Sequence, residues 1–141
     1  MKFIITTIIF LVIGLSCQAQ SLTIEFDNIR NDEGQLIVTV YPSEDIWLDE
    51  IDELEHYFPK ENIVDGKMSV SINEMQTGIF GVAMMDDVDG DGEMKYNFLG
   101  MPREGYGFSR NFKVKLSKPK FEDCVLEFKN DTTIQIHVQY F

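Results

Sequence analysis

Apolar and polar side chains alternate along most of the chain after residue 20. Alternation with a period of two places one face of a segment on a core and the other in water, as in a half-buried β-strand. The pattern recurs about seven times, at residues 22–26, 36–40, 68–72, 79–85, 108–116, 124–128 and 134–140. It predicts an all-β fold, an antiparallel β-sandwich of immunoglobulin-like or prealbumin-like type.

Two neighbouring pairs of these segments are predicted to form hairpins. Residues 31–34 (Asn-Asp-Glu-Gly) separate the first pair, and Asn130-Asp131 separates the last pair, and both are turn-forming sequences. Segment 79–85 is apolar on both sides, which predicts a central strand covered on both faces.

Residues 43–58 break the alternation and predict a short helical insertion. Ser43 could cap its start and Pro59 would end it. Its apolar residues recur at nearly helical spacing: Ile46, Trp47, Ile51, Leu54 and Phe58. Its acidic residues are predicted to form a solvated face: Asp45, Asp49, Glu50, Asp52, Glu53 and Glu55.

The N-terminus has the layout of an export signal, with Lys2 followed by an apolar run over residues 3–15. The run is too short to span a bilayer, and no later segment has spanning length. Cleavage after Ala19 would leave residues 20–141 as one domain. We expect an exported protein that is periplasmic, on the cell surface or secreted. Lipidation at Cys17 is the less favoured alternative, because Gly14 stands where a lipobox has leucine.

The net charge limits the classes of partner that the chain is expected to bind, and the cysteine content limits how the fold can be stabilised. The formal net charge is −12, and removal of Lys2 with the signal makes it −13. A negative chain disfavours nucleic acid and anionic membranes as partners. Cleavage would leave Cys124 alone, so no intramolecular disulfide is expected. Its place in an alternating segment predicts a buried, inert thiol.

An acidic segment over residues 86–93 follows the predicted central strand. Asp87, Asp89, Asp91 and Gly92 occupy positions one, three, five and six of a Ca²⁺-loop pattern, and Glu93 at position seven could add its backbone carbonyl. Positions nine and twelve are Lys95 and Phe98, so an EF-hand proper is not predicted. Two interpretations remain: a looser Ca²⁺ site, or a turn whose side chains bond their own backbone.

The stretch that follows, residues 96–109, mixes glycines with aromatic residues. Its run Leu-Gly-Met-Pro-Arg-Glu-Gly-Tyr-Gly-Phe-Ser over 99–109, between the acidic loop and the Pro-Lys-Phe-Glu-Asp of 119–123, resembles the bacterial family called domain of unknown function 2141. The resemblance covers about residues 22–141. It implies an exported β-sandwich protein with no established reaction or ligand.

The chain departs from that family at two places. Asp86-Asp87 stands where members usually have histidine-aspartate, and Lys95 stands where many have a further aspartate. The second departure removes a cation ligand that the resemblance would otherwise supply.

The side chains of this stretch suggest a ligand surface or a loop anchor. Tyr96, Phe98, Tyr106 and Phe108 could form a platform for a sugar or peptide, or could anchor the loop to the sandwich. Arg103 and Glu104 are candidate ligand contacts that could also pair with each other at the surface. Gly100, Gly105 and Gly107 would allow positive φ or close packing.

The sequence offers little for catalysis, and we expect no enzyme activity. The two histidines are His56, on the acidic segment, and His137, predicted to point outward from its strand. No nucleophile elbow, zinc spacing or phosphate loop is present. We therefore expect an exported binding module, Ca²⁺-stabilised through the acidic loop. The alternative is a metal-free structural or interaction module of the cell envelope. Its partner would be an envelope protein or a glycan.

Overall fold

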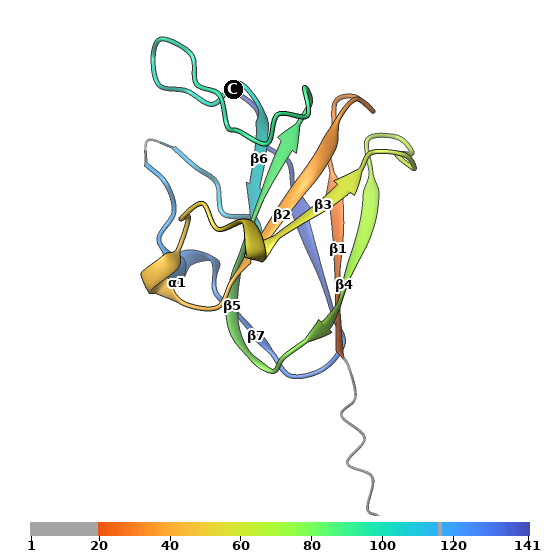
Figure 1. Ribbon diagram of the computed structural model, residues 1–141, viewed down its shortest axis with the longest axis vertical. Helices are drawn as coiled ribbons and strands as arrows, with labels where there is room; N and C mark the ends of the chain where they lie inside the picture. Colours follow the sequence, from red (N-terminus) through yellow and green to blue (C-terminus); the bar gives the residue numbers. More distant parts are fainter. Residues whose placement is uncertain (1–19, 116) are drawn as a thin grey trace, which may run out of the picture.

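The computed structural model describes residues 20–115 and 117–141. Eight strands in these residues form two sheets that face each other (Figure 1). The predicted all-β sandwich is confirmed, with only short helical turns between strands. The predicted export signal and Cys17 lie outside the described residues.

Within the described ranges, no helix has the length and apolarity needed to cross a membrane.

The first sheet has three strands in the order β4-β1-β8. Strand β1 (Gln20–Asp27) is antiparallel to β4 (Met68–Met75) and parallel to β8 (Thr132–His137). The inward side chains of β1 are Leu22, Ile24 and Phe26, and all three are buried as the alternation predicts. The parallel β1–β8 pair was not predicted, because alternation does not encode strand direction.

The second sheet runs β3-β2-β5-β6, with β7 pairing to the first residues of β5. Its strands are β3 (Glu55–Pro59), β2 (Gln35–Tyr41), β5 (Gly78–Asp87), β6 (Gly105–Phe108) and β7 (Leu126–Phe128). All its pairs are antiparallel. Strand β5 lies between neighbours on both sides, which confirms the predicted central strand.

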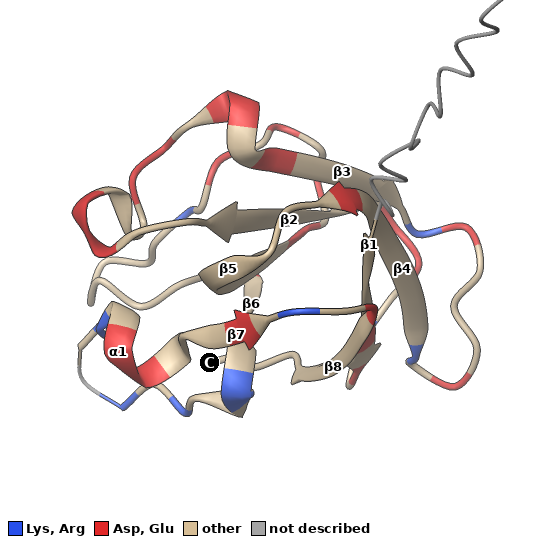
Figure 2. Cartoon of the chain, turned by 90° about the horizontal axis from the view of Figure 1, so that it is seen from below, with Lys and Arg blue, Asp and Glu red and all other residues tan. Residues whose placement is uncertain are grey.

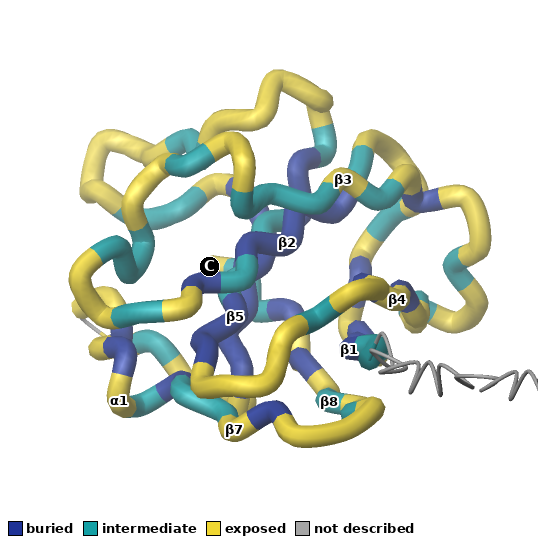
Figure 3. Tube along the Cα trace, turned by 60° about the horizontal axis from the view of Figure 1, so that its bottom comes forward, coloured by how far each residue is buried: buried dark blue, intermediate teal, exposed yellow. Residues whose placement is uncertain are grey.

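Strand β5 is buried on both faces because it separates two apolar clusters. Phe80, Val82 and Met84 face the main core between the sheets. Ala83 packs on a second cluster, built on buried Tyr106, Phe108 and Cys124, outside the second sheet. Figure 3 shows burial concentrated along β2 and β5, with exposure in the connecting loops.

Both predicted hairpins are wrong. Strands β1 and β2 belong to different sheets, and so do β7 and β8, so each connection crosses from one sheet to the other. The turn residues are present, and Asn31 Oδ1 accepts the Glu33 N–H at 3.1 Å. A crossing loop and a hairpin loop need the same turn chemistry, so the sequence pattern does not distinguish them.

The predicted helix over 43–58 is also wrong. The segment forms two short 3₁₀ turns, Glu44–Ile46 and Asp52–Leu54, and then strand β3. Ser43 precedes the first turn without a side-chain cap bond. Trp47, one of the apolar residues of this segment, packs against Tyr41, with the two ring centroids 5.0 Å apart. Its indole N–H donates to the Pro119 carbonyl at 2.8 Å. Asp and Glu, drawn in red in Figure 2, lie on the turns that lead into β3.

In the described residues of the predicted strand over 108–116, the strand ends at the first residue, Phe108. Strand β6 stops at Phe108, and a 3₁₀ turn, Ser109–Asn111, follows. Ser109 is buried, accepts the Val82 N–H at 2.9 Å and donates to the Cys124 carbonyl at 2.5 Å, so it directs the chain away from the sheet.

Cys124 lies in the short helix α1 (Phe121–Cys124) rather than in a strand. Its predicted burial is confirmed, and burial raises the pKa of its thiol to about 12.

Candidate metal site and the neighbouring hairpin

The acidic loop begins at the end of β5 and is organised by Asp87. This buried carboxylate accepts the Gly90 N–H at 2.8 Å through Oδ1 and the Gly92 N–H at 3.1 Å through Oδ2. The side-chain amide of Gln35 also donates to Oδ2 at 2.8 Å. Gly90 and Gly92 have φ of +75° and +80°, the left-handed region that glycine adopts without steric cost. The loop therefore curls back over the carboxylate that anchors it.

Four carboxylates converge inside this curl. Asp87, Asp89, Asp91 and Glu104 each place one oxygen within 4.8 Å of the others. The carboxylate of Glu93, predicted at position seven, is outside this cluster, and its side chain is exposed. The fourth carboxylate comes instead from the far end of the following hairpin, next to strand β6.

Glu104 is the unusual member of this carboxylate cluster. It is only 7% exposed, and its Oε2 atom is buried without a hydrogen-bond partner among the described residues. Burial raises the pKa of Glu104, and the charges of the three aspartates raise it further, while a bond from the Lys95 N–H acts in the opposite direction. The predicted surface pair with Arg103 is wrong, because Glu104 points inward while Arg103 is exposed.

Lys95 supplies the positive charge nearest to the cluster. Its Nζ atom contacts an oxygen of Asp89 and lies 2.6 Å from Asp91 Oδ2. These two bonds raise the pKa of Lys95, and the bond from Lys95 lowers the pKa of Asp91. One lysine thus faces a cluster of four carboxylates.

Residues 95–103 form a hairpin that joins the two sides of the cluster. The Arg103 N–H donates to the Lys95 carbonyl at 2.8 Å, and Tyr96 and Pro102 form an isolated bridge. At its tip, Asn97 Oδ1 accepts the N–H groups of Leu99 and Met101 at 2.9 and 3.0 Å. Phe98 is 95% exposed at this tip, and Leu99 beside it is 70% exposed. A hydrogen-bonded turn therefore presents two apolar side chains to solvent.

The structure divides the predicted aromatic platform into two groups. Tyr96 and Phe98 are exposed on the hairpin, while Tyr106 and Phe108 are buried in the second apolar cluster. The first pair is available to a ligand, and the second pair anchors strand β6.

The glycines of this stretch have different tasks. Gly100 has a φ of +76°. A Cβ on Gly105 would lie 2.5 Å from the Tyr140 ring, and one on Gly107 would lie 2.5 Å from Ile136, so these two permit close packing.

A buried ion pair lies on the core side of the loop, and sequence reasoning missed it. Lys60 Nζ lies 2.5 Å from Asp86 Oδ1, and both side chains are fully buried. Tyr140 donates its hydroxyl to the other oxygen of Asp86 at 2.5 Å, and Lys60 also donates to Asn31 Oδ1 at 2.9 Å. Asp86 is therefore held by an ion pair within the core, whereas its neighbour Asp87 is held by N–H groups of the acidic loop and by Gln35.

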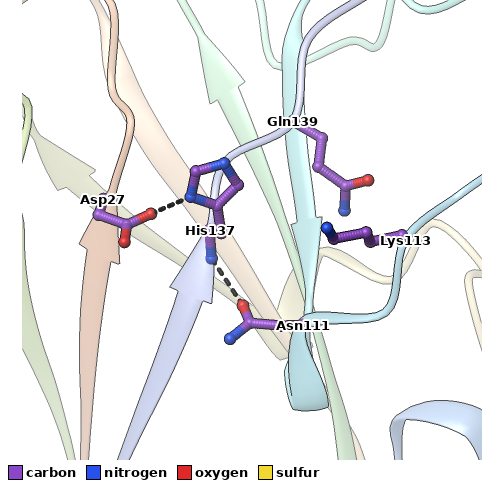
Figure 4. A pocket seen from close by; sticks show the side chains of 5 residues that line it. All are labelled: Asp27, Asn111, Lys113, His137 and Gln139. Carbon is purple, nitrogen blue, oxygen red and sulfur yellow. Dashed lines mark hydrogen bonds and ion pairs between the residues drawn. The ribbon is translucent and has the colours of Figure 1, made fainter.

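A separate set of polar residues lines a shallow depression of about 340 Å³ at the ends of β1 and β8. Asp27 and His137 face each other there, and the His137 ring is hydrogen-bonded to the Asp27 carboxylate (Figure 4). His137 is exposed, which confirms its predicted outward direction. The side chain of Gln139 is bonded to the backbone of Phe112 and Val114, so it serves the local chain path.

The fold and the loop define an acidic β-sandwich with a carboxylate cluster at the end of its central strand. The chain belongs to the family described as "uncharacterized protein conserved in bacteria (DUF2141)", whose model matches residues 24–136. That range includes most of both sheets, the carboxylate cluster and the hairpin, and it confirms the resemblance drawn from the sequence. Searches of curated proteins and of solved structures found no match.

Proposed function

We propose that this protein is an exported, non-catalytic binding module in which Ca²⁺ joins the acidic loop to the hairpin. Asp87, Asp89 and Asp91 would bind the ion from the loop, and Glu104 would bind it from the base of the hairpin. The observation that carries the proposal is the Oε2 atom of Glu104, which is buried beside three other carboxylates and has no hydrogen-bond partner in the part of the chain that the structure describes. A buried carboxylate oxygen without a partner is costly, and a bound cation would remove that cost.

The chemistry and spacing of the four carboxylates suit a hard divalent ion. Ca²⁺ prefers oxygen ligands at about 2.3–2.6 Å, so two ligands on opposite sides of the ion lie roughly 5 Å apart. The mutual separation of the four oxygens, within 4.8 Å, is compatible with one shared ion. The Asp87 carboxylate already accepts three donors, one on Oδ1 and two on Oδ2. A carboxylate has about four lone-pair sites in all, so Oδ1 can still bind an ion.

Ca²⁺ in excess is expected to raise the thermal unfolding temperature of the purified protein by several degrees relative to chelator. A ligand that binds only the native state stabilises it by about 2.7 kcal/mol at 100 times its dissociation constant. The double variant Asp89→Ala with Asp91→Ala should lose this response, and so should Glu104→Gln. Glu104→Gln should also stabilise the metal-free protein by about 1 kcal/mol, because it removes an unpartnered buried charge.

The matched control is Asp45→Ala with Glu50→Ala, which removes two exposed acidic residues outside the cluster. This control should keep the full Ca²⁺ response. An unfolding temperature that is the same in chelator and in millimolar Ca²⁺ would show that the carboxylate cluster is a self-bonded turn.

The exposed tip of the hairpin supports a second candidate, a metal-free interaction module of the cell envelope. In that case Phe98 and Leu99 would contact an envelope protein or a glycan without help from a cation. Phe98→Ser is expected to abolish capture of the partner from an envelope extract, whereas Val64→Ser, at another exposed apolar residue, should retain it. Equal capture in chelator and in Ca²⁺ would favour this candidate, and capture only in Ca²⁺ would favour the first.

A further inference from the structure

The carboxylate cluster already contains a cation from the protein itself. The Nζ atom of Lys95 contacts the carboxylates of Asp89 and Asp91, which are the two exposed members of the four. No ion pair in the described part of the chain joins Lys95 to the two buried members, Asp87 and Glu104. Lys95 therefore neutralises the outer half of the cluster and leaves the inner half unneutralised.

The backbone fixes Lys95 at this place. Its carbonyl accepts the Arg103 N–H at 2.8 Å across the base of the hairpin, directly before Glu104. The side chain itself is 43% exposed, so its ammonium group can leave the aspartates and enter water. The lysine is thus held near the site by its main chain but is not locked into it by packing.

A divalent ion and the ammonium group of Lys95 would compete for the same oxygens. An ion bound by all four carboxylates would need the oxygens of Asp89 and Asp91 that Nζ now contacts. Two positive charges at such short range also repel each other, since the interaction energy varies inversely with distance. Binding of the ion therefore requires that Lys95 withdraw.

We propose that Lys95 is an internal competitor that sets the Ca²⁺ affinity of this site. The inference rests on the proposed function. The competitor would place the dissociation constant near the upper end of the range of about 10⁻⁴–10⁻³ M found in extracellular modules. The site would then be empty at low Ca²⁺ and filled only where the ion is abundant.

Calorimetric titration of the purified protein with Ca²⁺ tests this inference through three single substitutions. Lys95→Met removes the charge and adds no oxygen ligand, and we expect it to lower the dissociation constant by about 10- to 100-fold. Lys95→Arg keeps a competing cation and should stay within about threefold of the unmodified protein. Lys67→Met is the matched control, because it removes one positive charge from an exposed residue outside the site.

The outcomes separate the inference from the proposed function. If Lys95→Met and Lys67→Met bind Ca²⁺ with equal affinity, and the unmodified protein binds it too, then Lys95 is not a competitor. The proposed metal site would be retained. Binding by Lys95→Met alone would support the competitor and show that the natural protein keeps its site closed. Absence of binding in every variant would overturn the metal site, and the inference with it.

Discussion

Replacement of Lys60 by methionine is expected to lower the free energy of unfolding by about 3–5 kcal/mol. Lys60 and Asp86 form an ion pair whose side chains are both fully buried, so solvent does not reach Asp86 to replace a lost partner. Removal of one member of such a pair leaves an uncompensated charge in the interior, which costs more than the pair contributes. Of the side chains in residues 20–115 and 117–141, the hydroxyl of Tyr140 would be the one that still donates to the Asp86 carboxylate.

Denaturant unfolding measures this effect, and two further variants define its cause. Lys115→Met removes an exposed lysine and should change the free energy of unfolding by no more than about 0.5 kcal/mol. Lys60→Met combined with Asp86→Leu should recover much of the loss, because the uncompensated charge is gone. A loss below about 1 kcal/mol in Lys60→Met alone would mean that water reaches Asp86.

Gly34→Ala is expected to be the most disruptive small substitution, with a loss of about 3 kcal/mol or more. A Cβ on Gly34 would lie 2.0 Å from the Asp87 carbonyl oxygen and 2.6 Å from that of Val88. The φ of Gly34 is also +72°, which costs an L-residue about 1–2 kcal/mol. Because both contacts are with backbone, the start of the acidic loop would have to move.

Gly90→Ala is the control that measures the cost of a positive φ without a steric clash. Its φ is +75°, but a Cβ there would meet nothing within 4 Å, so it should cost only about 1–2 kcal/mol. Gly34→Ala should also weaken the Ca²⁺ response, since it displaces Asp87, whereas Gly90→Ala should weaken it less. Thermal unfolding in Ca²⁺ and in chelator measures both effects, and equal losses in the two variants would contradict the close approach of Gly34.

Along β1 and β2, the sequence was sufficient to predict which side chains face the core between the sheets. Leu22, Ile24 and Phe26 are buried as their alternation predicts, and so are Leu36 and Val38. The alternation depends only on local geometry, so it is the same whether a strand pairs with its neighbour in sequence or with a distant strand. The hairpin predicted at Asn31–Gly34 was wrong for that reason, since β1 and β2 enter different sheets.

Only part of the carboxylate cluster could be predicted from the sequence. Asp87, Asp89 and Asp91 are close in sequence, so their convergence could be predicted from loop geometry. Glu104 joins them because the hairpin after Lys95 returns the chain to the same place, and that return depends on pairing between β5 and β6. The pair of Lys60 and Asp86 is separated by strand β4 and most of β5, so no local pattern connects the two residues.

The parallel arrangement of β1 and β8 affects how the protein would respond to mechanical load. Strand β1 enters the sheet at Gln20, and β8 runs beside it in the same direction, so the C-terminal end of the chain leaves from the opposite end of the pair (Figure 1). Tension between these two ends would act along the strands and slide one past the other. Six registered residue pairs, from Leu22–Thr132 to Asp27–His137, would then bear the force together instead of opening one after another.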